Sequence, residues 1–192
     1  MDFIRKQFSE AATVLEAFST EENFKHIEKA GDVLADCLTN GNKIISCGNG
    51  GSMSDAMHFA EELSGRYRGD RKSLSAIAIS DSGHITCVGN DYGYDKVFSR
   101  FVEGWGRKGD TLLAISTSGN SENVIKAVES AHQRGMKVIG LLGKTGGKLK
   151  DMVDIPLVVP SDITDRIQEI HIKCIHILIE GVERSLFPEN YA

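Results

Sequence analysis

The sequence predicts an α/β fold of three layers, in which helices cover both faces of a doubly wound, five-stranded parallel β-sheet. The chain has 192 residues, enough for one domain with a sizeable core. After residue 41, short apolar runs alternate with segments of helical periodicity, which is typical of buried parallel strands joined by helices. No proline-rich or low-complexity linker divides the chain, so we expect residues 1–192 to form a single domain.

Two helices are predicted ahead of the sheet, within residues 1–40. Apolar side chains recur at helical spacing in residues 2–18, and again in residues 24–38, where the pattern ends near Asn40. We expect these helices to form an N-terminal extension. Residues 41–192 then form the α/β core and its last helix.

The elements of the core alternate along the chain. The predicted strands are short and apolar, whereas the segments between them follow a period of 3.6. The strands are expected at residues 43–47, 76–79, 111–115, 137–142 and 155–159. The helices are expected at residues 52–67, 84–88, 95–106, 121–134 and 164–186.

The last predicted helix, residues 164–186, carries isoleucine and leucine around its full circumference. A long helix with this pattern is buried on all sides, and in a small domain a partner subunit is needed to cover it. The sequence therefore predicts a homo-oligomer. Gln168, His171 and His176 lie within this apolar surface, where polar groups must be paired or used. We interpret His171 as a structural or interface residue.

Composition excludes several classes of function. The formal net charge is −5 and no basic stripe is present, which argues against nucleic acid as a partner. The apolar runs are too short to span a membrane, and the N-terminus has no secretory signal, so we expect a cytoplasmic protein. The four cysteines are widely spaced, so we expect neither a disulfide framework nor a cysteine zinc site.

Two loops of unusual composition each join a predicted strand to a helix. The first, residues 48–52, has three glycines that let backbone N–H groups approach a ligand, and Ser52 is expected to cap the next helix. The second, residues 116–121, has four hydroxyl side chains that can bind phosphate without lysine. Ligands of open α/β sheets bind at such strand ends, although ordinary turns with serine caps remain an alternative. Neither loop has a nucleotide-binding motif.

Two helices carry candidate catalytic groups. His58 and Glu62 are four residues apart, so they share one helix face and can hold a metal ion or a substrate. Such pairs are also common on protein surfaces, and Glu61 is a competing carboxylate. On the last helix, Gln168 and His176 lie within roughly 80° of each other and of Asp165. A satisfied core histidine is an equal alternative for His176.

Several segments together resemble one known family. Residues 116–121 look like the hydroxyl-rich phosphate loop of sugar isomerase (SIS) domains. The rest of the resemblance is to the phosphoheptose isomerases within that family, and it covers nearly the whole chain. It rests on residues 48–52, 55–63 and 65–68, on Asn90 and Asp91, and on residues 165–171 with His176 beyond them.

The resemblance implies a SIS-fold intramolecular isomerase that interconverts D-sedoheptulose 7-phosphate and D-glycero-D-manno-heptose 7-phosphate. This reaction is the first step toward the ADP-heptose of the lipopolysaccharide core. It also implies one zinc ion per subunit, held by His58, Glu62, Gln168 and His176, in a homotetramer with sites at subunit interfaces. We expect Glu62 to be the base that moves a proton through an enediol, with His176 as its partner acid.

The resemblance further implies which residues bind the sugar phosphate. Most lie in the two loops, and Arg66 is as easily explained as a solvated arginine at a helix end. The implied substrate-binding residues are Asn49, Gly50, Gly51, Ser52, Glu62, Arg66, Asn90, Asp91, Ser116, Thr117, Ser118, Ser121, Asp165 and Gln168.

Two other functions are compatible with a SIS fold. One is a non-catalytic binding module of the replication-initiator-associating type, and the other is a different SIS enzyme, such as a pentose-phosphate isomerase or an aminosugar lyase. A binding module needs neither a base nor an acid. The presence of all four implied metal ligands therefore favours the isomerase.

Overall fold

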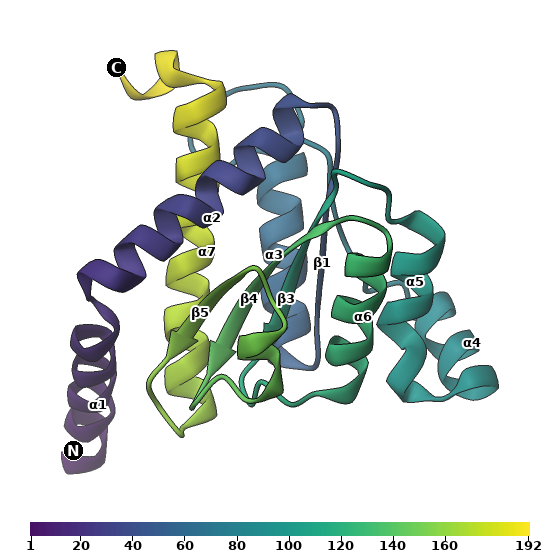
Figure 1. Ribbon diagram of the computed structural model, residues 1–192. Coiled ribbons are helices and arrows are strands. Elements are labelled where there is room, and N and C mark those ends of the chain that lie inside the picture. The colour runs from purple at the N-terminus through teal and green to yellow at the C-terminus, as the bar shows by residue number, and fades with distance from the viewer.

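The computed structural model describes all 192 residues, and a single five-stranded sheet lies at its centre (Figure 1). Every strand pair is parallel, and the strand order is β2-β1-β3-β4-β5. The fold class predicted from the sequence is confirmed. The strands are β1 (Ile44–Gly48), β2 (Ala76–Ala78), β3 (Thr111–Ser116), β4 (Lys137–Gly143) and β5 (Ile155–Val159).

The helices lie where the hydrophobic periodicity predicts them, with differences at their ends. The segment predicted at residues 84–88 is a longer helix, because Asp81 caps it by accepting the N–H of His84 at 2.7 Å. The helices are α1 (Asp2–Phe18), α2 (Glu21–Thr39), α3 (Gly51–Ser64), α4 (Ser82–Tyr92), α5 (Val97–Trp105), α6 (Glu122–Gln133) and α7 (Thr164–Leu186), with short 3-10 turns at Tyr94–Lys96, Lys148–Asp151 and Pro188–Tyr191.

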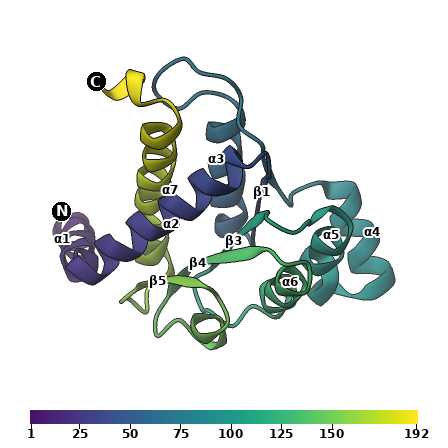
Figure 2. The same ribbon diagram turned by 45° about the horizontal axis from the view of Figure 1, so that its top comes forward.

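Helices cover both faces of the sheet, and alternate strand residues point to opposite faces. Leu113 and Ile115 of β3 pack in the apolar core beneath α2, α3 and α7. Leu112 and Ala114 pack in a second core beneath α4, α5 and α6. Figures 1 and 2 show the two groups of helices on opposite sides of the strands. The three layers follow directly from strands that are buried on both faces.

Helix α1 projects from the body of the molecule and its contacts are mainly with α7 (Figure 1). Its backbone is anchored by Arg166, whose Nη1 donates to the carbonyl of Gln7 at 2.7 Å. Phe18 is buried, but Phe3 and Phe8 are 70% and 75% exposed. The extension therefore presents an apolar face that the rest of its own chain does not cover. No helix is long and apolar enough to cross a membrane.

Helix α7 is buried along most of its length against α2, α3 and the sheet. His171 is fully buried, and its Nε2 donates to the carbonyl of Leu142 at 3.0 Å, which bears out a structural role. Within the single chain a stripe of α7 remains at the surface, including Lys173 and Ile177. The apolar pattern is thus only partly explained by packing inside one subunit.

The strand order places a topological switch point between β1 and β3. The chain leaves β1 in one direction across the sheet and leaves β3 in the other. The loops that follow these two strands therefore lie next to each other at the carboxyl edge of the sheet, which is where ligands of open α/β sheets bind. These are the two loops that the sequence singles out, residues 48–52 and 116–121.

Candidate active site

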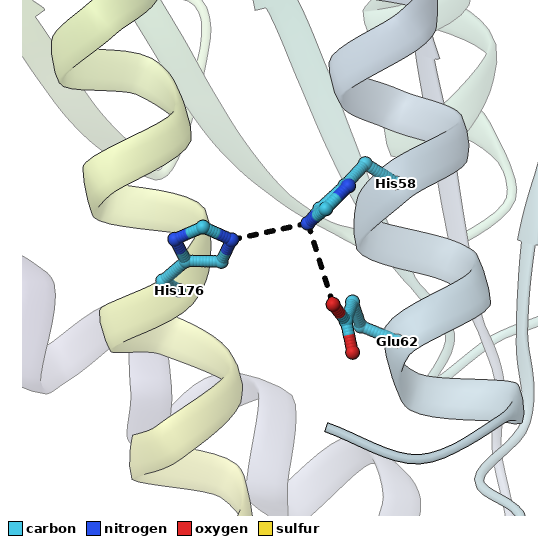
Figure 3. A group of neighbouring side chains, drawn as sticks. All are labelled: His58, Glu62 and His176. Atoms are coloured by element: carbon cyan, nitrogen blue, oxygen red, sulfur yellow. Dashed lines mark hydrogen bonds and ion pairs between the residues drawn. The ribbon is translucent and has the colours of Figure 1, made fainter. Parts of the chain in front are cut away.

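Three side chains from two adjacent helices converge on one point (Figure 3). His58 and Glu62 come from α3, and His176 faces them from α7. The Nε2 atoms of the two histidines are 3.0 Å apart, and Nε2 of His58 is 3.5 Å from Oε1 of Glu62. One donor atom from each residue lies within 4.8 Å of the others. Two imidazoles and a carboxylate are ligands that zinc prefers, so these residues fit a metal ion.

The surroundings keep His176 in its neutral form. Burial, together with the neighbouring His58, lowers the pKa of His176 below its ordinary value. The ring of Tyr67 stacks on that of His176, with centroids 5.8 Å apart. A neutral imidazole can bind a metal ion through a ring nitrogen, or accept and donate a proton. The site is therefore suited to either task near pH 7.

Glu62, rather than Glu61, belongs to this group. The side chain of Glu62 is 17% exposed and its carboxylate faces Nε2 of His58. The side chain of Glu61 is 66% exposed and lies 3.8 Å from Nδ1, on the other side of the ring. The spacing of four residues thus selects the carboxylate that the sequence analysis prefers.

The side chain of Gln168, a residue of α7, packs against the start of α3, beside the first loop. A Cβ atom at Gly51 would be only 2.4 Å from Nε2 of Gln168, so the amide packs directly on this glycine. His176 lies eight residues further along α7, about 12 Å along the helix axis. A side chain at position 51 would therefore displace Gln168. The contact connects Gln168 to the glycine loop that precedes His58 and Glu62.

The prediction that Ser52 caps α3 is wrong. The helix begins at Gly51, and its N-cap is Gly50, whose φ of 57° favours glycine. Ser52 is buried in the first turn instead. A glycine cap places no side chain of its own at the start of the helix, where the amide of Gln168 packs on Gly51 instead.

The side chain of Asn49 connects the first loop to α6. Its amide forms a reciprocal pair with that of Asn123, at 2.9 and 2.8 Å, and its oxygen also accepts the hydroxyl of Tyr94 at 2.9 Å. Asn123 is buried directly after the second loop. The sequence analysis missed Asn123 and Tyr94, because nothing local shows that they contact a residue so far away in the chain.

The second loop gathers hydroxyl groups. Oγ of Ser116 lies 3.0 Å from that of Ser121 and 3.5 Å from that of Ser118. Gly119 has a φ of 66°, and a Cβ there would be 1.9 Å from the carbonyl oxygen of Gly146. The close backing by residue 146 forces the loop into a tight turn. Convergent hydroxyls in such a turn suit the oxygens of a phosphate.

The remaining predicted residues form no hydrogen bond or ion pair with His58, Glu62 or His176 in the single chain. Arg66 is exposed just beyond α3. Asn90 donates to Asp91 at 2.7 Å at the end of α4, on the other side of the sheet. The exposed carboxylate of Asp165 accepts from Arg166 at 2.9 Å. The hydrogen bonds of Asn90, Asp91 and Asp165 are thus made to neighbouring residues of the chain.

Comparison with known proteins identifies the family of this chain. The sequence pattern of the SIS domain matches residues 7–143. Together with a five-stranded parallel sheet and a loop of clustered hydroxyls, the match defines the chain as a SIS-domain protein. The chain is 57% identical to a phosphoheptose isomerase of Aeromonas hydrophila, over 96% of this chain and 97% of the relative. It is 52% identical to that of Fusobacterium nucleatum, over 100% and 98%.

Solved structures give the same result. A phosphoheptose isomerase from Francisella tularensis superimposes with a TM-score of 0.92 at 39% identity, covering 95% of this chain and 97% of that one. One from Neisseria gonorrhoeae gives 0.88 at 42% identity, with the same coverage. The chain belongs to the phosphoheptose isomerase family and is an isomerase. The resemblance that the sequence analysis describes is confirmed.

Proposed function

We propose that this chain interconverts D-sedoheptulose 7-phosphate and D-glycero-D-manno-heptose 7-phosphate. The observation that carries the proposal is the convergence of His58, Glu62 and His176 beside the switch-point loops, in a chain of this family. A non-catalytic SIS binding protein would have no need of this group. The high identity to phosphoheptose isomerases over nearly the whole chain likewise disfavours a different SIS enzyme.

The reaction moves a carbonyl from C2 to C1 of the sugar. A proton must leave C1 and arrive at C2, and a second proton must pass from O1 to O2, through an enediol. Glu62 is the base that takes the proton from C1 and returns it to C2. His176, held neutral by burial, exchanges protons with the two oxygens. A carboxylate oxygen of Glu62 and a ring nitrogen of His176 lie within 4.8 Å of each other, so both groups can serve the C1–C2 end of one substrate.

We propose that a zinc ion is held by His58, Glu62, Gln168 and His176. The converging donors of three of these residues support the proposal, and family resemblance adds Gln168. Bound zinc would supply a Lewis acid that polarises the sugar carbonyl. Glutamine is an uncommon zinc ligand, so we expect weaker binding than at a structural zinc site.

The phosphate is proposed to bind at the second loop, at Ser116, Thr117, Ser118 and Ser121. The clustered hydroxyls support this placement, because they offer several hydrogen-bond donors in one loop. Gly50 and Gly51 of the first loop follow the neighbouring strand β1 at the same edge of the sheet. The proposed set of substrate-binding residues is completed by the polar groups of Asn49, Ser52, Arg66, Asn90, Asp91, Asp165 and Gln168.

The proposed assembly is a homotetramer with sites completed at subunit interfaces, each subunit acting as one SIS domain over residues 1–192. The proposed assembly is supported by exposed apolar side chains, namely Phe3 and Phe8 on α1 and Ile177 on α7, because apolar surfaces of this kind usually meet a partner. A partner subunit would also bring Asp91, which lies in α4 on the other face of the sheet, to a site. Sedimentation equilibrium should give four times the chain mass, whereas a fully active monomer would contradict the assembly.

The test of the function is direct. Purified protein is incubated with sedoheptulose 7-phosphate, with zinc and with a chelator, and the aldose product is measured. We expect product that depends on the metal. In the cell we expect the reaction in the cytoplasm, where its product would be a precursor of lipopolysaccharide heptose. Absence of product under every metal condition would refute the isomerase, and product unaffected by the chelator would refute the metal alone.

A further inference from the structure

A buried arginine holds the C-terminal end of α3. The last carbonyls of any helix lack partners within the helix. Here Nη2 of Arg71 donates to the carbonyl of Glu62 at 2.6 Å, and Nη1 donates to those of Leu63 and Gly65 at 2.8 and 3.0 Å. The side chain of Arg71 is 0% exposed. The guanidinium is thus bonded to the main chain of Glu62, the proposed base.

The same guanidinium is bonded to α7. Its Nε donates to Oε1 of Glu183 at 2.8 Å, and the Glu183 side chain is also 0% exposed. The other oxygen of Glu183 accepts the hydroxyl of Tyr191 at 2.6 Å. Both carboxylate oxygens are therefore satisfied, as a buried charge requires. We call Arg71, Glu183 and Tyr191 the clamp.

The clamp lies in line with the catalytic candidate on α7. Glu183 follows His176 by seven residues, two helical turns, so both lie on the same face. Between them, Glu180 pairs with Arg68 at 2.8 Å, and His176 itself stacks on Tyr67. The chain that leaves α3 therefore runs along one stripe of α7 from His176 to Glu183.

We propose that the clamp is a positioning device, which fixes the distance between Glu62 on α3 and His176 on α7. This inference rests on the proposed function. Apart from the contacts of His176 with His58 and of Gln168 with Gly51, α3 and α7 meet through apolar packing, which has no preferred direction. The guanidinium of Arg71 has a planar fork of donors, and its charged hydrogen bonds fix both distance and angle. Lysine at this position would keep the charge and lose the fork.

The experiment compares Arg71→Lys, Glu183→Gln and Tyr191→Phe with the parent protein. Arg107→Lys is the matched control, because Arg107 is exposed in the loop before β3. Three properties are measured: circular dichroism, kcat and KM with sedoheptulose 7-phosphate, and the affinity for Co²⁺ from its visible absorption bands. Co²⁺ reports the geometry of the histidine and carboxylate donors independently of catalysis.

For the folded Arg71 and Glu183 variants we expect about a tenfold fall in kcat and in Co²⁺ affinity, as is typical when a supporting partner is removed. KM should change less than kcat, and Tyr191→Phe should show the same pattern more weakly. Folded variants with unchanged kcat and Co²⁺ affinity would overturn the proposal. If the parent enzyme has no isomerase activity, the proposed function fails, while the Co²⁺ titration still decides whether the clamp positions the donors.

Discussion

At the scale of single residues, the same side chain has different roles depending on its surroundings. His176 lies at the surface of a site, where it meets His58 and stays partly accessible. His171, on the same helix, is enclosed by the core and donates to the carbonyl of Leu142, while its Nδ1 has no partner. A proton on Nδ1 would be buried without an acceptor. Burial accordingly lowers the pKa of His171 to about 4.

This shift makes stability depend on pH. The folded state keeps His171 neutral down to about pH 4, whereas the unfolded chain binds a proton below its ordinary pKa of 6.5. Stability should fall as pH drops through that window, by about 2 kcal/mol between pH 7.5 and pH 5. The free energy of unfolding at each pH is measured by urea denaturation with a chelator present. The pH dependence should shrink in His171→Gln; an identical dependence in both proteins would contradict the assignment.

At the scale of elements, the site depends on contacts between segments that are distant in sequence. The glycine loop after β1 and the start of α6 are joined by the reciprocal amides of Asn49 and Asn123. The strands and helices could be predicted from apolar periodicity, and so could the face shared by His58 and Glu62. The partner of Asn49 could not, because it lies 74 residues away and its identity depends on the strand order.

The amide pair gives a prediction for loop position. Asn123→Ala leaves Asn49 without its partner, so the two loops should lose their fixed spacing. We expect KM for the sugar phosphate to rise about tenfold, and stability to fall by about 1–3 kcal/mol. Tyr94→Phe removes only one outer hydrogen bond and serves as the milder control. Steady-state kinetics measure KM in both variants. A KM unchanged in Asn123→Ala would show that the Asn49–Asn123 pair has no role in substrate binding.

At the scale of the whole molecule, the strand order brings the two loops to one edge of the sheet. Apolar side chains of α1 and α7 remain exposed elsewhere. Composition and periodicity could predict the layers, because each strand is buried on both faces. They could not predict that Gly50 rather than Ser52 is the N-cap of α3, since that depends on the positive φ that the backbone adopts at Gly50. The position of Asp91 in α4, on the other face of the sheet, is consistent with a site that needs more than one chain.

The central claim is that His58, Glu62 and His176 form the isomerase centre, and two adjacent carboxylates test it. Glu62→Gln and Glu61→Gln remove the same charge from neighbouring positions of α3, but only Glu62 faces the group. The measurement is the rate of aldose formation from sedoheptulose 7-phosphate with metal present. We predict a loss of about a hundredfold or more in Glu62→Gln and at most a few-fold change in Glu61→Gln. Equal rates in the two variants would contradict the account.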